Sequence, residues 1–150
     1  MTSIFNPEAF LNSTQSGGFS TKRPTVNDGE YPGQLMEGKD GFDIKVVPVD
    51  GKPRFILALG WELLSDTARE QTGLDKPRVK QDIWLDVEGG SLMRDRTHNV
   101  ELGRFLEGVG LNSASGEWSP IQLRTLGVCK LKVVTDKQGY NKVTAAVRMG

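Results

Sequence analysis

The sequence predicts a mainly β protein, and three observations support this class. Eighteen glycines and seven prolines lie in short clusters, which favours many strands and turns over a helical bundle. Between these clusters, several segments alternate apolar and polar residues as strands do. Helical spacing of apolar residues is clear in one stretch, residues 99–110, and a length of 150 residues is typical of one domain with one core.

The charge composition limits how a nucleic acid could bind. The chain has 19 Lys and Arg residues against 19 Asp and Glu, so such a partner would have to bind a local basic patch. A single cysteine, Cys129, excludes an internal disulfide and, with one histidine, argues against a structural zinc site. The longest apolar run, residues 55–64, is too short to cross a bilayer, and we expect a soluble intracellular protein without a membrane partner.

Residues 1–27 are expected to form an N-terminal extension. Asn6 and Pro7 predict a helix start, with the asparagine as cap and the proline at the first helical position. Phe10 and Leu11 are expected to pack this short helix against the body. The rest of the extension is rich in Ser, Thr and Gly and is typical of a flexible linker.

The first strands of the globular part lie on either side of a polar break. Residues 31–36 and 42–47 have strand-like patterns and residues 37–41 interrupt them, so the two segments form either a hairpin or one sharply bent strand. The next strand begins after a turn at residues 49–53. One of its faces is apolar throughout, which predicts a core position for its tryptophan: Phe55, Leu57, Leu59, Trp61 and Leu63.

The strand at residues 78–85 has two contrasting faces. A polar loop with one helical turn precedes it. Alternation places Val79, Ile83 and Leu85 on a face that is expected to be buried. The opposite face carries cations and an aromatic ring, which suit phosphates and bases but are also ordinary on a solvated strand: Arg78, Lys80, Asp82 and Trp84.

Two helices and a basic hairpin complete the predicted elements. The helix within residues 99–110 has Asn99 as its expected cap and Gly110 as its stop. The tetrapeptide SPIQ at residues 119–122 matches a capping box, so a second short helix is expected to end at Gly127. Two strands joined by a tight turn then close the chain, with Asp136 against five basic residues: Lys130, Lys132, Lys137, Lys142 and Arg148.

The order of these elements indicates a particular architecture. If the first two strand segments are one bent strand, the order is strand, strand, strand, helix, strand, strand. This is the order of an OB-fold, a five-stranded Greek-key barrel. Residues 28–150 are therefore predicted to be an OB-fold domain with a helix between strands 3 and 4 and a second short helix. A β-sandwich with two surface helices is the alternative.

Three separate segments would bring cations and aromatic rings to one face of this fold. Nucleic-acid-binding OB-folds use strands two and three, with the loops that join strands one and two and strands four and five. Cations interleaved with exposed rings suit a single-strand binder without sequence preference, because stacking contributes about 1–3 kcal/mol per base. Each residue alone fits a solvated surface as well, and it is their convergence that favours binding. The candidate nucleic-acid-binding residues are Lys52, Arg54, Lys76, Arg78, Lys80, Trp84, Lys137, Tyr140 and Lys142.

No pattern in the sequence indicates catalysis. There is no glycine-rich phosphate loop and no nucleophile elbow, and the acidic residues of the middle region have no two-metal spacing. We therefore expect no enzymatic activity, no catalytic residue, no cofactor and no bound metal.

Three motifs carry a resemblance to a known family. They are residues 28–35 (DGEYPGQL), residues 99–106 (NVELGRFL) leading into Gly110-Leu111-Asn112, and residues 135–143 (TDKQGYNKV). Together they resemble the small single-stranded DNA-binding proteins encoded by bacteriophages, which have one OB-fold. The resemblance implies a viral protein of the bacterial host cytoplasm that coats single-stranded DNA during replication or recombination. It also implies phage or host replication and recombination proteins as further partners.

Two other functions are compatible with the sequence. An OB-fold does not dictate its ligand, so a protein–protein interaction module built on a β-barrel, without nucleic-acid binding, is the alternative. A metal-dependent nuclease is the third. Phage proteins of the kind named above often end in an acidic tail, whereas this sequence ends with Val147-Arg148-Met149-Gly150, directly after a predicted strand.

Overall fold

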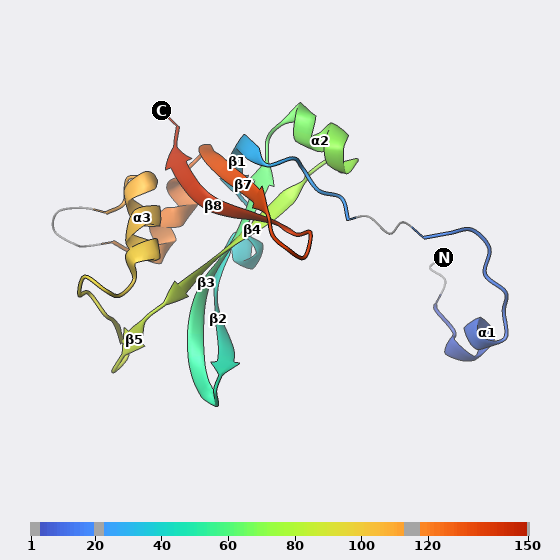
Figure 1. Cartoon of the computed structure of the whole chain (residues 1–150), viewed down its shortest axis with the longest axis horizontal. Helices are drawn as coiled ribbons and strands as arrows, with labels where there is room; N and C mark the ends of the chain where they lie inside the picture. The colour runs from blue at the N-terminus through green and yellow to red at the C-terminus, as the bar shows by residue number, and fades with distance from the viewer. Residues whose placement is uncertain (1–3, 20–22, 113–117, 150) are drawn as a thin grey trace.

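The computed structural model describes residues 4–19, 23–112 and 118–149. Figure 1 shows most elements gathered around one strongly curved sheet, with the first helix lying apart from it. In chain order the elements are α1 (Pro7–Leu11), β1 (Gly29–Leu35), the 3-10 helix η1 (Gly38–Asp40), β2 (Phe42–Val49), β3 (Lys52–Leu63), α2 (Asp66–Thr72), β4 (Arg78–Leu85), β5 (Val87–Glu88), β6 (Ser91–Leu92), α3 (Val100–Gly108), the 3-10 helix η2 (Pro120–Thr125), β7 (Cys129–Thr135) and β8 (Asn141–Arg148).

One six-stranded sheet carries the fold, which confirms the mainly β class. Its strands lie in the order β1-β7-β8-β4-β3-β2, and β1 also pairs with β3, so the pairings run round a ring. The pairing of β4 with β8 is parallel, whereas the other pairings of this sheet are antiparallel. The ring places the start of β8 next to the start of β4, with Lys142 opposite Lys80.

Strands β1 and β2 form one interrupted strand, and the hairpin alternative is wrong. Both pair with β3, β1 near the end of β3 and β2 along its first two thirds. The helix η1 fills the break, where Met36 N donates to the Gly60 carbonyl (3.0 Å) and Gly60 N donates to the Gly41 carbonyl (2.9 Å). A Cβ atom at Gly60 would collide with the Asp40 carbonyl oxygen, so the chain needs glycine at this close approach.

The hydrophobic core lies inside the ring. The predicted apolar face of β3 is buried from Leu57 to Leu63, and Trp61 is 0% exposed, as predicted. The indole Nε1 of Trp61 donates to Oε1 of Gln81 (2.9 Å), a buried amide on β4. Helix α3 packs its buried residues Leu102, Phe105 and Leu106 against the same core.

Helix α3 begins and ends where the sequence predicts, but Asn99 does not cap it with its side chain. Instead, Nδ2 of Asn99 donates to the carbonyl oxygens of Asp86 (2.9 Å) and Met93 (2.8 Å), and Oδ1 accepts from Asp86 N (2.8 Å). These bonds tie the helix start to the end of β4, and they take up the polar groups that a cap would use. Gly110 follows the helix with φ +78°, as expected for a stop.

The second predicted helix is present as the 3-10 helix η2. Ser119 N donates to Oε1 of Gln122 (2.7 Å), which is one of the two bonds of a capping box. Gly127 lies two residues beyond the helix with φ +69°, a backbone conformation that favours glycine.

The N-terminal helix α1 forms as predicted, with Asn6 Oδ1 accepting from Glu8 N (3.0 Å) and Ala9 N (3.2 Å). Its expected packing against the body is wrong, since Phe10 and Leu11 are exposed. Phe10 instead contacts Phe5, with ring centroids 5.3 Å apart, and a five-residue helix has little surface to bury.

The body of the protein already includes Val26. This residue is buried, its N–H donates to Asn141 Oδ1 (2.8 Å), and its carbonyl accepts from Asn141 Nδ2 (3.1 Å). The chain is therefore joined to the start of β8 two residues before residue 28. Among the helices of the described residues, none is long and apolar enough to cross a membrane.

Candidate nucleic-acid interface

The two faces of β4 differ as the sequence predicts. Burial alternates strictly along the strand, with Val79, Ile83 and Leu85 buried. Trp84 lies between two of these buried residues and is 41% exposed. The buried residues on both sides of the tryptophan fix its backbone position in the sheet.

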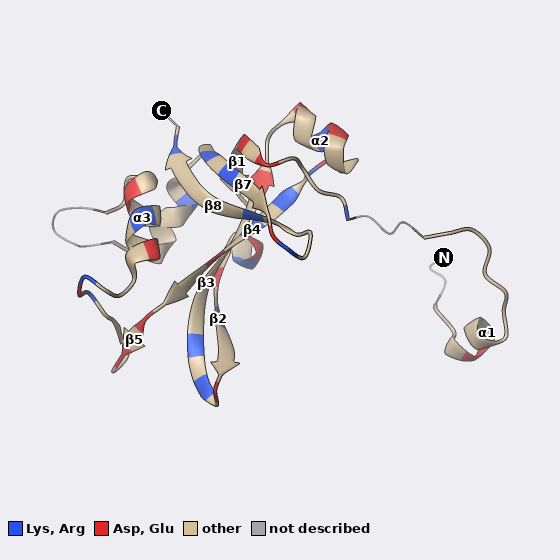
Figure 2. Ribbon diagram, in the orientation of Figure 1, with Lys and Arg blue, Asp and Glu red and all other residues tan. Residues whose placement is uncertain are grey.

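A groove of about 700 Å³ runs along β4 and β8. The parallel pairing of these strands brings together side chains that are about 60 residues apart in the sequence. Figure 2 shows Lys and Arg on both ribbons. Five predicted candidates line this groove: Arg78, Lys80, Trp84, Tyr140 and Lys142.

The cations of the groove are available to phosphates. Within the described parts of the chain, Arg78, Lys80 and Lys142 form no ion pair within 4 Å. Lys80 and Lys142 also stand opposite each other on neighbouring strands, where like charges repel unless an anion lies between them. Carboxylates balance part of this charge, because Asp82, Glu101 and Asp136 line the groove as well.

The β7–β8 turn presents Tyr140 at the edge of the groove. Asp136 Oδ1 accepts from Gln138 N (2.9 Å) and Tyr140 N (3.0 Å), and Gly139 has φ +85°. The Asp136 carboxylate is therefore committed to shaping the turn. Tyr140 is 46% exposed, and the guanidinium carbon of Arg23 lies 3.6 Å from its ring centroid, so a cation already covers one face of the ring.

Arg54 reaches Trp84 from the neighbouring strand. Its guanidinium carbon lies 5.2 Å from the ring of Trp84, and its Nη2 lies 3.5 Å from Asp86 Oδ1. The predicted convergence of the β2–β3 hairpin with β4 is thus present for Arg54. Three further candidates are exposed but do not line the groove: Lys52, Lys76 and Lys137.

A second groove of about 290 Å³ lies on the other side of β4. It shares Arg78, Lys80 and Asp82 with the first, so these outer residues of β4 form a ridge between the two. Lys39 and Lys45 also line it, and the sequence did not identify them, because the break at residues 37–41 hid the register of β2. Arg23 was missed as well, since only the bonds between Val26 and Asn141 bring it near Tyr140.

The remaining polar cluster lies in the loop before α3, away from both grooves. Hydrogen bonds from the Thr97 side chain, the Thr97 backbone and His98 lower the pKa of Asp95 to about 2. These bonds join neighbours in the sequence and shape a turn. The described residues include no group of three or more metal-ligating side chains.

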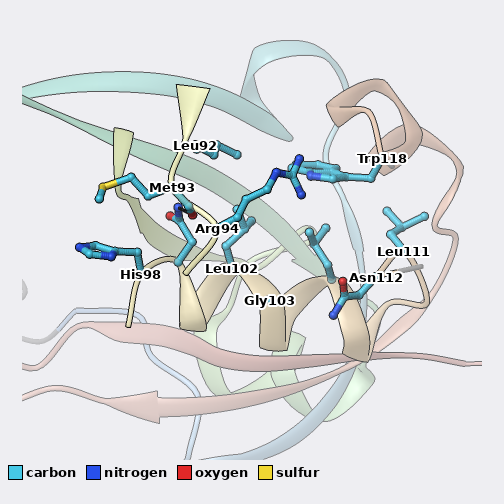
Figure 3. A pocket seen from close by; sticks show the side chains of 11 residues that line it. Leu92, Met93, Arg94, His98, Leu102, Gly103, Leu111, Asn112 and Trp118 are labelled. Atoms are coloured by element: carbon cyan, nitrogen blue, oxygen red, sulfur yellow. Dashed lines mark hydrogen bonds between the residues drawn. The ribbon is translucent and has the colours of Figure 1, made fainter. Parts of the chain in front are cut away.

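A pocket of about 180 Å³ lies beside α3 (Figure 3). Leu92 and Leu102 line it, and the Arg94 side chain points toward the ring of Trp118. Among the described residues its lining includes no aspartate or glutamate.

Comparison of the chain with protein-family models, with curated proteins and with solved structures gave no match.

Proposed function

We propose that this protein binds single-stranded DNA without sequence preference in the groove along β4 and β8. The observation that carries the proposal is the convergence of two exposed aromatic rings, Trp84 and Tyr140, with the cations Arg78, Lys80 and Lys142. The rings offer stacking surfaces for bases, and the cations offer charge to phosphates. Double-stranded DNA hides its bases, so the rings would contribute little to binding it.

The connectivity of the sheet supports an OB-fold for this domain. With β1 and β2 counted as one strand, the fourth strand, β7, lies beside the first, which is the Greek-key arrangement. Helix α3 stands between the third and fourth strands, β4 and β7. In OB-folds that bind nucleic acids, strands two and three and the loop between strands four and five form the binding face. The groove lies on the corresponding elements here, β4 and the β7–β8 turn.

The proposed activity is non-enzymatic coating of DNA strands. Binding through rings and through charge on the DNA backbone tolerates any base sequence. The resemblance of three motifs to phage single-stranded DNA-binding proteins supports a role in phage replication or recombination, in the cytoplasm of a bacterial host.

Binding of labelled oligothymidine and of a duplex of equal length, at two salt concentrations, tests the proposal. We expect tighter binding to the single strand, with an affinity that falls as salt rises. Lys142→Gln should weaken binding, and Lys132→Gln serves as its matched control, because Lys132 is exposed on β7 outside the groove. Equal affinity for the duplex, or no binding at low salt, contradicts the proposal.

A further inference from the structure

The N-terminal arm, residues 4–19, exposes an unusual number of apolar side chains. Ile4 is 92% exposed and Phe19 90%, and Phe5, Phe10 and Leu11 are exposed as well. Glu8 is the single charged residue of the arm. Figure 1 shows α1 lying apart from the sheet. Clustered exposed apolar residues of this kind are typical of segments that bind another surface.

The body carries an apolar groove that fits such a segment. This groove, of about 360 Å³, lies between the β2–β3 hairpin, β5, β6 and η2. Its lining is almost entirely apolar and includes Leu57 and Leu85 of the core, with Phe55, which packs against the core. Ile44 and Val87, at its edge, are exposed. It shares Leu92 and Trp118 with the pocket of Figure 3, which extends the apolar surface toward α3.

We propose that the N-terminal arm of one copy docks in the apolar groove of a second copy. Both surfaces are apolar and exposed in the single chain, so their contact would bury both. Fourteen residues separate Leu11 from Val26, where the chain joins the body. Such a segment spans up to about 50 Å when extended, which is enough to reach a neighbouring molecule.

In the structure the arm does not occupy the groove of its own chain, because Phe10 and Leu11 are exposed and α1 lies apart from the sheet (Figure 1). The arm leaves the body beside the nucleic-acid groove, which Arg23, Pro24 and Thr25 help to line. The apolar groove lies at the end of β4, where Leu85 follows Trp84 of the nucleic-acid groove. Copies that follow one another along a DNA strand would place the arm of one near the apolar groove of the next. Such a head-to-tail contact produces a filament where its rotation does not close into a ring. This last step rests on the proposed function.

Sedimentation of the full-length protein without nucleic acid tests the docking itself. We expect the wild type to self-associate as its concentration rises. Phe10→Ser in the arm and Val87→Asp in the groove should each abolish association, and both sites are exposed, so folding should persist. Leu74→Ser and Val147→Asp are matched controls at exposed apolar sites outside the arm and outside the groove. A wild type that stays monomeric at its highest soluble concentration, or controls that dissociate equally, overturns the proposal.

A mixture of the two variants identifies the partner. If the arm binds a second copy, the intact arm of Val87→Asp can enter the intact groove of Phe10→Ser, and a dimer should form. If the arm binds its own body, mixing changes nothing, and the proposal is wrong.

DNA binding then separates this inference from the proposed function. On an oligonucleotide that holds one copy, Phe10→Ser should bind like the wild type, whereas on a long strand it should lose about tenfold in affinity per site or more. Equal affinities on the long strand overturn the docking. Failure of all forms to bind DNA contradicts the proposed function alone, because sedimentation reports the docking independently.

Discussion

Two tryptophans on neighbouring strands show how differently the two faces of the sheet are built. Trp61, on β3, is 0% exposed and its indole N–H is bonded to Gln81. Trp84, on β4, is 41% exposed and lies beside the Arg54 guanidinium. On the inner face the polar groups of Trp61 and Gln81 bond to each other, whereas the outer face leaves the Trp84 ring and cations accessible to a ligand. Substitutions on the inner face should therefore change stability, and substitutions on the outer face should change binding.

Trp61→Ala should have the largest effect of all. It removes a fully buried ring from the core and leaves a cavity, and it also leaves the Gln81 amide without its partner. We expect a loss of about 3–5 kcal/mol in the free energy of unfolding. Chemical denaturation followed by circular dichroism measures it. An unfolding midpoint equal to that of the wild type would show that Trp61 is not part of the core.

Trp84→Ala should weaken binding to single-stranded DNA and leave the fold intact. Losing one stacked base costs about 1–3 kcal/mol, which corresponds to roughly 5- to 150-fold in affinity. Its unfolding free energy should fall by about 1 kcal/mol or less, because the ring is partly exposed. Titration and denaturation of the same preparation measure both quantities. If stability falls as far as for Trp61→Ala, the two faces are not distinct.

Gln81→Leu tests the polar contact of the inner face. The change introduces an apolar side chain of similar size and removes the acceptor of the buried Trp61 N–H. A buried donor without a partner costs about 1–3 kcal/mol, so the denaturation midpoint should fall. The DNA affinity of the folded protein should stay unchanged. Asp82→Leu, on the outer face one residue away, is the matched control and should leave the midpoint nearly unchanged.

Lys80→Gln should have the smallest effect, visible mainly in the salt dependence of binding. Each phosphate contact contributes about 0.7 to the slope of log affinity against log salt for single strands, and this variant should lose one contact. Binding isotherms at several salt concentrations give the slope. An unchanged slope would mean that the Lys80 ammonium group does not contact a phosphate.

Strand alternation made much of this comparison predictable from the sequence. The period-two pattern of residues 78–85 was sufficient to separate Ile83 from Trp84, and the apolar row ending in Leu63 indicated that Trp61 is buried. These predictions depend on neighbours in the chain, where backbone geometry alone fixes the side-chain direction.

The rest depends on contacts between distant segments. Arg23 reaches Tyr140 because Val26 is bonded to Asn141, a pairing across 115 residues that no local pattern announces. Asn99 is a residue type that commonly caps helices, but its side chain instead bonds to Asp86 after β4 and to Met93 after β6. The packing of Phe10 was mispredicted because a local apolar pattern does not say which surface it covers.

Tryptophan fluorescence separates the two faces in a single titration. With oligothymidine, we expect wild-type emission to be quenched, because Trp84 stacks on bases while Trp61 stays buried. Trp84→Phe should lose the quenching but still bind, as measured independently by anisotropy of a labelled strand. Equal quenching in Trp84→Phe and the wild type would contradict the assignment of the outer face of β4 as the DNA-binding surface.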